Sequence, residues 1–130
     1  MSERLKILLV EDNLLNQRVV TFSLKKYNHE VIIANNGVEA VEQYRTDSFD
    51  VILMDIMMPV MDGLEATVKI REVENQNGLQ KRTPIIALTA NTMDNDKEKC
   101  LSYGMDEFMA KPFDIEKLKK IFRELEIVSE

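Results

Sequence analysis

The sequence predicts an α/β fold in which helices cover both faces of a parallel sheet. Five short apolar runs recur along the chain, and segments with helical periodicity separate them. The first four runs are continuous and rich in Val, Ile and Leu, which is typical of strands buried on both faces. We therefore predict strands at residues 7–10, 31–34, 51–54, 85–88 and 108–110.

Amphipathic helices are predicted between and after these strands. The clearest stripe consists of Ile115, Leu118, Phe122 and Leu125, with basic side chains mostly on the other faces. Residues 91–101 offer few apolar side chains to a core, so we expect a short and loosely held helix there. The other stripes are Leu15, Val19 and Phe22, then Val38, Val41 and Tyr44, then Leu64 and Val68.

Strand followed by helix, five times, predicts a doubly wound (βα)5 sheet, because right-handed crossovers leave few other arrangements. The flavodoxin-like strand order 2-1-3-4-5 is favoured for five such units. Ligands of these sheets bind beyond the carboxyl ends of the strands, here between the first and third. We expect a single domain over residues 1–130 with its core at about residues 5–126, since this length is usual for one domain.

Composition argues against several classes of function. A net charge of −6 disfavours binding to nucleic acid or to anionic membrane surfaces, because both are bound through Lys and Arg. Cys100 is the only cysteine, so no internal disulfide can form, which fits a reducing cytoplasm. No signal peptide is evident, and no stretch approaches the roughly 18 apolar residues of a membrane span. We therefore expect a cytoplasmic protein.

The residues that follow the predicted strands carry complementary chemistry. Glu11 and Asp12 follow the first strand, and Asp55 follows the third. Thr89 follows the fourth strand, and Lys111 follows the fifth. Because the carboxyl ends of parallel strands meet at one edge, three acids, a hydroxyl and an ammonium group are expected to lie together.

Each of these residues also has an ordinary explanation when it is considered alone. Asp12 or Asn13 can cap the following helix, and Asp55 can occupy a turn. Thr89 can simply end a strand, and Lys111 can be a solvated lysine. The combination is the stronger indication, because four of the five strand ends carry groups that complement one another.

The acids predict a site for a hard divalent cation. Carboxylates held within a few ångström repel one another, and a cation relieves that repulsion. Mg²⁺ prefers oxygen ligands and keeps several waters, so one or two carboxylates and a phosphoryl oxygen satisfy it. A carboxylate can also accept a phosphoryl group, whose charge a metal ion and an ammonium group neutralise.

Four segments of the chain resemble the receiver domains of response regulators. They are ILLVEDN (7–13), VILMDIMMPVMDG (51–63), PIIALTA (84–90) and GMDEFMAKPF (104–113), and the likeness extends from about residue 6 to about residue 125. EDNLLNQ (11–17) and PIIALTAN (84–91) further resemble receivers of hybrid sensor histidine kinases and phosphorelays. The resemblance implies a protein that is no turnover enzyme, but that catalyses its own phosphorylation from phosphohistidine and its own slow dephosphorylation.

The resemblance also implies a role for each acid. Asp55 would be the phosphoacceptor. Glu11, Asp12, Asp55 and the backbone carbonyl of Met57 would bind Mg²⁺, with Mn²⁺ as a possible substitute. Met57 and Asn91 would tune the lifetime of the phosphoryl group, and the uncharged Met57 side chain favours a moderately long lifetime.

Further roles follow from the same resemblance. Lys111 would pair with the phosphoryl group, and the Lys111–Pro112 peptide bond would be cis, as only X–Pro bonds commonly are. Thr89 would bond the phosphoryl group and, with Phe108, form the switch. The surface that changes would comprise the fourth helix, fifth strand and fifth helix, which would contact an unknown downstream protein.

The expected phosphoryl donor is a sensor histidine kinase or a histidine phosphotransfer domain. Its docking face is expected on the first helix, near Asn16, Gln17 and Val20. No direct contact with nucleic acid or membrane is expected.

Three other classes of protein were weighed against the same residues. A haloacid-dehalogenase-type phosphatase normally carries a second Asp two residues after its nucleophile, where this chain has Met57. A flavodoxin needs a neutral phosphate loop after the first strand, and Glu11 and Asp12 would repel a flavin phosphate. A pure interaction module would not need the complete set of acids, Thr89 and Lys111.

Overall fold

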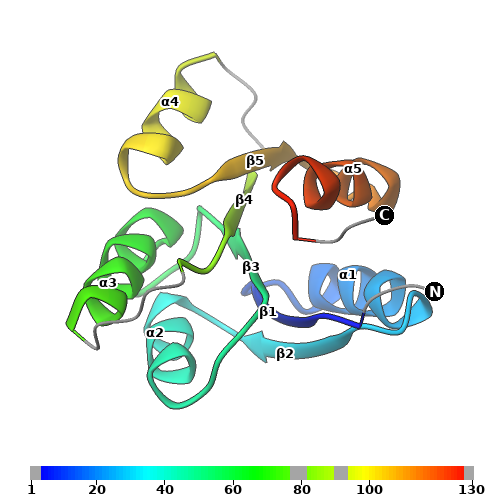
Figure 1. The fold of residues 1–130 in the computed structure, drawn as a ribbon, viewed down its shortest axis with the longest axis horizontal. Helices are drawn as coiled ribbons and strands as arrows, with labels where there is room; N and C mark the ends of the chain where they lie inside the picture. Colours follow the sequence, from blue (N-terminus) through cyan, green and yellow to red (C-terminus); the bar gives the residue numbers. More distant parts are fainter. Residues whose placement is uncertain (1–3, 77–81, 90–93, 128–130) are drawn as a thin grey trace.

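The computed structural model describes residues 4–76, 82–89 and 94–127, with the backbone alone at 94–97. Strands and helices alternate five times along the chain, as predicted (Figure 1). In chain order the elements are β1 (Lys6–Val10), α1 (Leu14–Lys26), β2 (Glu30–Ala34), α2 (Gly37–Thr46), β3 (Val51–Asp55), α3 (Gly63–Gln76), β4 (Ile85–Thr89), α4 (Asp94–Ser102), β5 (Glu107–Ala110) and α5 (Ile115–Glu124). None of these helices has the length and apolar character needed to cross a bilayer.

All five strands pair in parallel in the order β2-β1-β3-β4-β5, which confirms the predicted topology. Every residue of β3 and β4 is buried, which explains their unbroken apolar composition. The strand order reverses between β1 and β3, so their carboxyl ends flank the switch point of the sheet. Asp55 and Thr89 are the last residues of the two fully buried strands.

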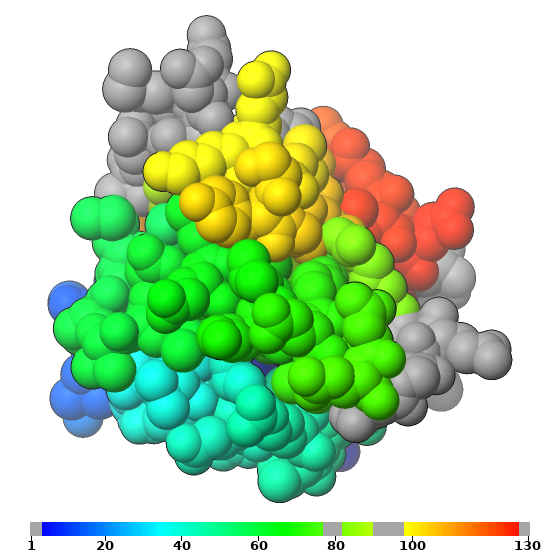
Figure 2. All heavy atoms as spheres, turned by 90° about the vertical axis from the view of Figure 1, so that its left-hand side faces the viewer, coloured from blue at the N-terminus to red at the C-terminus, as the bar shows by residue number. Residues whose placement is uncertain are grey.

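The sheet separates two hydrophobic cores, because successive side chains of a strand point to opposite faces. Leu8 and Ile52 belong to the core beneath α2, α3 and the end of α4, and these three helices cover that face (Figure 2). Ile7 and Leu53 belong to the core beneath α1 and α5. The predicted stripe of α5 is confirmed, since Leu118 and Phe122 are buried in that second core and Ile115 and Leu125 pack against it.

Helix α1 buries a different face from the one that its apolar stripe predicts. Leu15, Val19 and Phe22 are 69%, 49% and 74% exposed. The segment contains a second stripe, and the sheet covers that one instead. Its buried residues are Gln17, Val20 and Leu24. The prediction of the helix was therefore correct and that of its buried face was wrong, which leaves an apolar strip at the surface.

The remaining stripes are confirmed in part. Val41 and Tyr44 of α2 are buried, and so is Leu64 of α3, whereas Val68 is 37% exposed. Helix α4 lies within the weakly apolar segment 91–101 and one residue beyond it. Its Cys100 is buried at 2% exposure.

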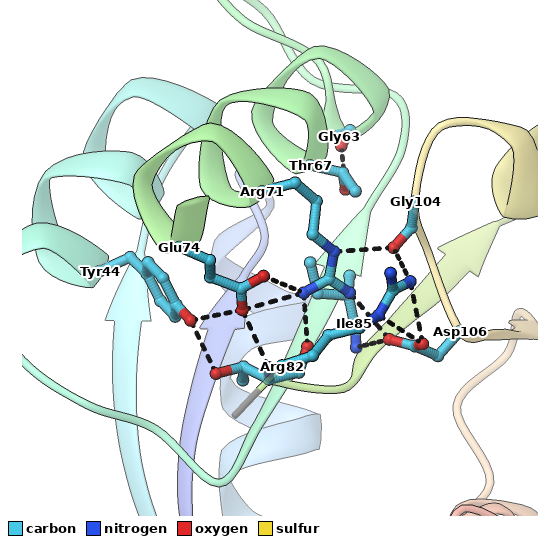
Figure 3. A network of polar contacts seen from close by, with 10 residues as sticks. Tyr44, Gly63, Thr67, Arg71, Glu74, Arg82, Ile85, Gly104 and Asp106 are labelled. Atoms are coloured by element: carbon cyan, nitrogen blue, oxygen red, sulfur yellow. Dashed lines mark hydrogen bonds and ion pairs between the residues drawn. The ribbon is translucent and has the colours of Figure 1, made fainter. Parts of the chain in front are cut away.

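A buried polar network joins α2 and α3 to the amino ends of β4 and β5 (Figure 3). Its centre is Arg71 of α3, whose guanidinium donates to both carboxylate oxygens of Glu74 at 3.0 Å. The same group donates to the Thr83 carbonyl at 2.8 Å, the Gly104 carbonyl at 3.0 Å and Asp106 Oδ2 at 2.9 Å. One side chain of α3 thus holds the segments that lead into two neighbouring strands.

The two carboxylates of this network are held by further donors. Glu74 Oε2 accepts from the Tyr44 hydroxyl at 2.6 Å and from the backbone N–H of Thr83 at 2.9 Å. Asp106 Oδ2 accepts from the backbone N–H of Ile85 at 2.8 Å. Burial and the hydrogen bond to Glu74 raise the pKa of Tyr44 to about 12, so its hydroxyl stays protonated and donating. Such a set of satisfied partners is what allows charged groups to be buried.

His29 closes the turn between α1 and β2 by a hydrogen bond that needs a neutral ring. Its Nδ1 atom accepts from the backbone N–H of Leu5 at 3.0 Å, and its ring lies edge-on to Phe122 with 6.3 Å between centroids. Burial lowers the pKa of His29, and the nearby Asp50 carboxylate opposes this effect only in part. A protonated ring could not accept the Leu5 hydrogen bond.

Acidification is therefore expected to destabilise the fold through His29. Because its pKa is lower in the folded chain, the unfolded chain binds the proton first as the pH falls. The stabilisation is complete above the ordinary pKa of 6.5 and is lost as the pH falls through the folded value. Urea unfolding in a chelating buffer measures the free energy of unfolding at about pH 7.5 and at about pH 5.5. The difference between these two free energies should be larger for wild type than for His29→Gln. Equal differences in the two chains would contradict this assignment.

Candidate functional site

Three carboxylates gather where β1 and β3 end. Glu11, Asp12 and Asp55 each place one oxygen so that all three lie within 4.8 Å of one another. Glu11 and Asp55 are buried, at 1% and 4% exposure, whereas Asp12 is exposed. The cluster therefore has a buried floor and one side that is open to solvent.

Lys111, which follows β5, points its ammonium group at the two buried acids. Its Nζ atom lies 3.1 Å from Asp55 Oδ2 and 3.3 Å from Glu11 Oε1. Burial lowers the pKa of Lys111, but the hydrogen bond and charge of Asp55 and the charge of Glu11 outweigh it, so the net direction is upward. The lysine is therefore protonated at neutral pH. One ammonium group cannot balance three ionised carboxylates, so the donor set fits a hard divalent cation.

Backbone groups orient the two buried carboxylates. Asp55 Oδ1 accepts from the N–H of Met57 at 3.2 Å, which holds the backbone of Met57 beside the cluster. Glu11 Oε2 accepts from the N–H of Asn13 at 3.1 Å. The N-cap of α1 is Asn13, whose side chain accepts from the N–H of Asn16. Asp12 is thus not required for capping, and its carboxylate remains available to the cluster.

Helix α3 begins in direct contact with the backbone of the acceptor strand. The N–H of Gly63 donates to the Ile56 carbonyl at 2.9 Å. A Cβ atom on Gly63 would meet the Asp55 carbonyl oxygen and the Ile56 Cα atom at distances shorter than van der Waals contact. Only glycine allows α3 to approach the end of β3 this closely.

Gly63→Ala is consequently expected to destabilise the chain by about 1–3 kcal/mol and to displace Asp55. The sign of the change in stability is informative, because a glycine-to-alanine substitution in an unobstructed helix would stabilise the chain by about 1 kcal/mol. Urea unfolding measures the stability of the two chains. A more stable Gly63→Ala chain would show that α3 moves aside without cost.

The structure places the other predicted residues around this cluster. Thr89 is buried at the end of β4, and its carbonyl accepts from the N–H of Lys111 at 2.7 Å. The Lys111–Pro112 peptide bond is cis. Phe108 is half-buried and packs against the core beneath α2 and α3. The Met57 side chain is 77% exposed, and Asn91 lies outside the described residues.

The predicted docking residues on α1 are placed differently from expectation. Gln17 and Val20 are 6% and 3% exposed and contribute little surface, and Asn16 is half-buried. The surface of α1 instead carries the apolar strip, which is Leu14, Leu15, Val19 and Phe22. A groove of about 480 Å³ lies between α1 and the segment after β5, and its lining includes Leu15 and Val19 of the strip together with Glu11 and Lys111.

Sequence reasoning also missed two contacts of the cluster. The side chain of Gln17 donates to the Glu11 carbonyl and to Asn35 Oδ1. The sequence signal for these contacts is the helical spacing of Gln17, Val20 and Leu24, which places the polar Gln17 on the same face as two buried apolar residues.

Comparison with known proteins identifies the family. The sequence model described as the response regulator receiver domain matches residues 7–123. The chain belongs to this family. Hybrid signal transduction histidine kinase B of Dictyostelium discoideum is 47% identical in an alignment over 119 residues that covers 85% of this chain and 6% of that relative. The receiver domain therefore spans a small part of the curated relative that it matches.

Solved receiver domains have the same fold. One is the receiver domain of the sensor histidine kinase PA1611 from Pseudomonas aeruginosa PAO1, which has a magnesium ion coordinated in its active site cleft. It is 42% identical, with a TM-score of 0.82 over 94% of this chain and 97% of that one. Another is the receiver domain of Ssk1 from Saccharomyces cerevisiae, solved with the histidine phosphotransfer protein Ypd1. It is 34% identical, with a TM-score of 0.86 over 95% of this chain and 90% of that one.

Proposed function

We propose that this receiver domain accepts a phosphoryl group from a phosphohistidine onto Asp55 and thereby works as one step of a phosphorelay. The observation that carries the proposal is the buried Asp55 carboxylate, which is held against Lys111 and lies within reach of Glu11 and Asp12. The relatives that are hybrid histidine kinases support the same role.

Mg²⁺ is the cation that this donor set fits best, and Mn²⁺ has similar ligand preferences. Glu11, Asp12, Asp55 and the carbonyl of Met57 would hold it. When bound, the ion would neutralise charge on the transferring phosphoryl group. The magnesium ion in the cleft of the Pseudomonas receiver domain supports this choice.

The side chains of this chain would carry the remaining parts of the reaction. An oxygen of Asp55 attacks phosphorus, the phosphorus–nitrogen bond of the donor breaks, and the donor imidazole leaves with the electron pair. Lys111 stabilises the negative charge of the phosphoryl oxygens, and the hydroxyl of Thr89 bonds one of them. The backbone N–H of Met57 keeps the Asp55 carboxylate in its orientation.

Hydrolysis of the aspartyl phosphate would reset the protein slowly. The side chain of Met57 carries no charge that could orient an attacking water, which favours a moderately long lifetime. Asn91 would be the second residue that tunes it. A hydrolysis half-life of seconds for the isolated domain would contradict this part of the proposal.

The signal would leave through the surface formed by α4, β5 and α5. Phosphorylation shifts a population between two conformations, in one of which Thr89 bonds the phosphoryl group and Phe108 turns inward. Phe108 lies on β5, three residues before Lys111, and is half-buried. An unknown downstream protein would recognise the changed surface.

The donor would dock on the apolar strip of α1 and the adjoining groove. Leu15, Val19 and Phe22 are exposed there, and Lys111, which contacts Asp55, lines the groove, so a bound donor could present its phosphohistidine to Asp55. The yeast receiver domain solved with a histidine phosphotransfer protein supports a donor of this kind. A sensor histidine kinase is the alternative donor.

Intact mass spectrometry tests the proposal on the wild-type chain. Incubation with Mg²⁺ and a small acyl-phosphate donor is expected to add one phosphoryl group, which hydroxylamine removes because an acyl phosphate is labile to it. A chelator in place of Mg²⁺ is expected to prevent the addition. Should the small donor fail, a phosphorylated histidine phosphotransfer domain replaces it. No adduct from either donor would refute phosphoacceptance.

A further inference from the structure

The buried face of α1 contains an amide where an apolar side chain would be expected. Gln17 is 6% exposed and shares this face with Val20 and Leu24. Burying an amide is unfavourable unless its hydrogen bonds are made inside the protein. Its Nε2 atom makes two, to the backbone carbonyl of Glu11 at 2.5 Å and to Asn35 Oδ1 at 2.8 Å.

Both backbone groups of Glu11 are thereby fixed, although Glu11 lies one residue beyond β1. Its N–H donates to the Ala34 carbonyl at 3.0 Å, which continues the pairing with β2. Within the described part of the chain no backbone N–H donates to its carbonyl, and the Gln17 side chain bonds it instead. The Glu11 carboxylate faces the acidic cluster and Lys111. The direction of this carboxylate therefore depends on how well its main chain is held.

Asn35 is itself held by a second helix. Its backbone N–H and its side-chain Nδ2 both donate to Glu39 Oε1 of α2, at 2.9 and 3.0 Å. The contacts from Glu39 to Asn35, from Asn35 to Gln17 and from Gln17 to Glu11 form a continuous chain of hydrogen bonds. This chain joins α2, the end of β2 and α1 to one member of the acidic cluster.

We infer that Gln17 is a positioning residue for the cation site, because its amide fixes the main chain of Glu11 and so keeps the Glu11 carboxylate in the cluster. The inference rests on the proposed function, in which this cluster binds Mg²⁺. Gln17 contacts no ligand itself and acts through Glu11 alone. Residues that orient metal ligands in this way typically change metal affinity by about 10–100-fold when they are replaced.

The two common hard cations should respond differently to a loosened Glu11. Mg²⁺ requires nearly ideal octahedral geometry at short distances, whereas Ca²⁺ accepts variable geometry and longer bonds. A displaced carboxylate therefore costs Mg²⁺ more binding than it costs Ca²⁺. The ratio of the two dissociation constants consequently reports positioning, and a general loss of stability does not change it.

Gln17→Met is the variant that tests the inference, since methionine has a similar length and volume but no amide. Titration calorimetry of the full chain with Mg²⁺ alone and with Ca²⁺ alone gives both dissociation constants, well below the unfolding temperature. The Mg²⁺ dissociation constant is expected to rise about tenfold or more. The Ca²⁺ value is expected to rise less, so the Mg²⁺/Ca²⁺ ratio increases.

Val20→Ala is the matched control, because Val20 lies on the same buried face one turn later and contributes only apolar packing. It is expected to lower stability and to leave both dissociation constants unchanged. Asn35→Ala is a second variant at an exposed side chain, for use if Gln17→Met does not fold. It removes one of the two acceptors of Gln17 and is expected to raise the same ratio by a smaller factor.

The outcomes separate the inference from the function on which it rests. A wild-type chain that binds no Mg²⁺ would overturn the proposed cation site and, with it, the role of Gln17. A wild-type chain that binds Mg²⁺, with unchanged ratios in Gln17→Met and Asn35→Ala, would overturn the positioning role alone. The same increase in Val20→Ala would also overturn it, since packing would then explain the effect.

Discussion

Replacing Asp55 with asparagine is expected to abolish phosphoryl transfer to this receiver domain. An amide oxygen carries no negative charge and cannot form the aspartyl phosphate. Asparagine has nearly the same shape, and its carbonyl can still accept from the N–H of Met57. Lys111 keeps its contact with Glu11 at 3.3 Å. The loss is therefore expected from chemistry and not from unfolding.

Intact mass after incubation with donor and Mg²⁺ measures this loss, and circular dichroism checks that Asp55→Asn is folded. Asp114→Asn is the matched control, because Asp114 caps α5 with its side chain and asparagine caps a helix equally well. That control should be phosphorylated like wild type. An adduct of equal size on Asp55→Asn would mean that another residue accepts the phosphoryl group, and peptide mapping would identify it.

Arg71→Met is expected to destabilise the fold by about 3–5 kcal/mol, which is the second large effect. The Arg71 and Glu74 side chains are only 13% and 7% exposed. Removing the guanidinium leaves the Glu74 carboxylate buried without its cation and leaves the carbonyls of Thr83 and Gly104 without that donor. An uncompensated buried charge is far more costly than a lost surface ion pair.

Urea unfolding of three chains checks the size of this effect. Lys119→Met is the matched control, because it removes the cation of an exposed pair with Glu116 and of a contact with the Tyr27 ring, where about 2 kcal/mol or less is expected in total. Arg71→Met combined with Glu74→Gln should recover part of the loss, since the unpaired carboxylate is then gone. A cost for Arg71→Met no larger than that for Lys119→Met would show that the network contributes little.

The strands and their order could be predicted because strands buried on both faces leave continuous apolar runs. The predicted strand at 51–54 differs from β3 only by Asp55, which the structure includes in the strand. At one edge of the sheet, β5 begins at Glu107, one residue before the apolar run. Polar residues at strand ends carry no hydrophobic signal, so the boundaries were less accurate than the strands themselves.

Much of the acidic cluster could be predicted from position alone. Parallel strands fix which residues share an edge, so the residues that follow each run indicate the members without knowledge of any contact. The buried face of α1 could not be predicted in this way. Its sequence holds two stripes, one with Leu15 and Phe22 and one with Val20 and Leu24, and periodicity cannot show which stripe the sheet covers.

The network around Arg71 could not be predicted from local pattern at all. Its partners lie far apart in the chain: Tyr44 and Thr83 are separated by 39 positions, and Arg71 and Asp106 by 35. Each of these residues is a common surface type when considered alone. Only the packing of α3 against the starts of β4 and β5 brings them together.

The position of that network matters for how this receiver domain can tolerate change. The Arg71 contacts lie at the amino ends of β4 and β5, whereas Thr89 ends β4 and Lys111 follows β5, about 13 Å away along a five-residue strand such as β4. Many proteins lose activity when they are made more stable, because the strained groups of a site are the ones that are relieved. Here the two sets of residues are separated by the length of a strand. Substitutions that strengthen the contacts around Arg71 can therefore accumulate without altering the acids of the site. The stability of this receiver domain and the reaction at its acidic cluster can thus change independently.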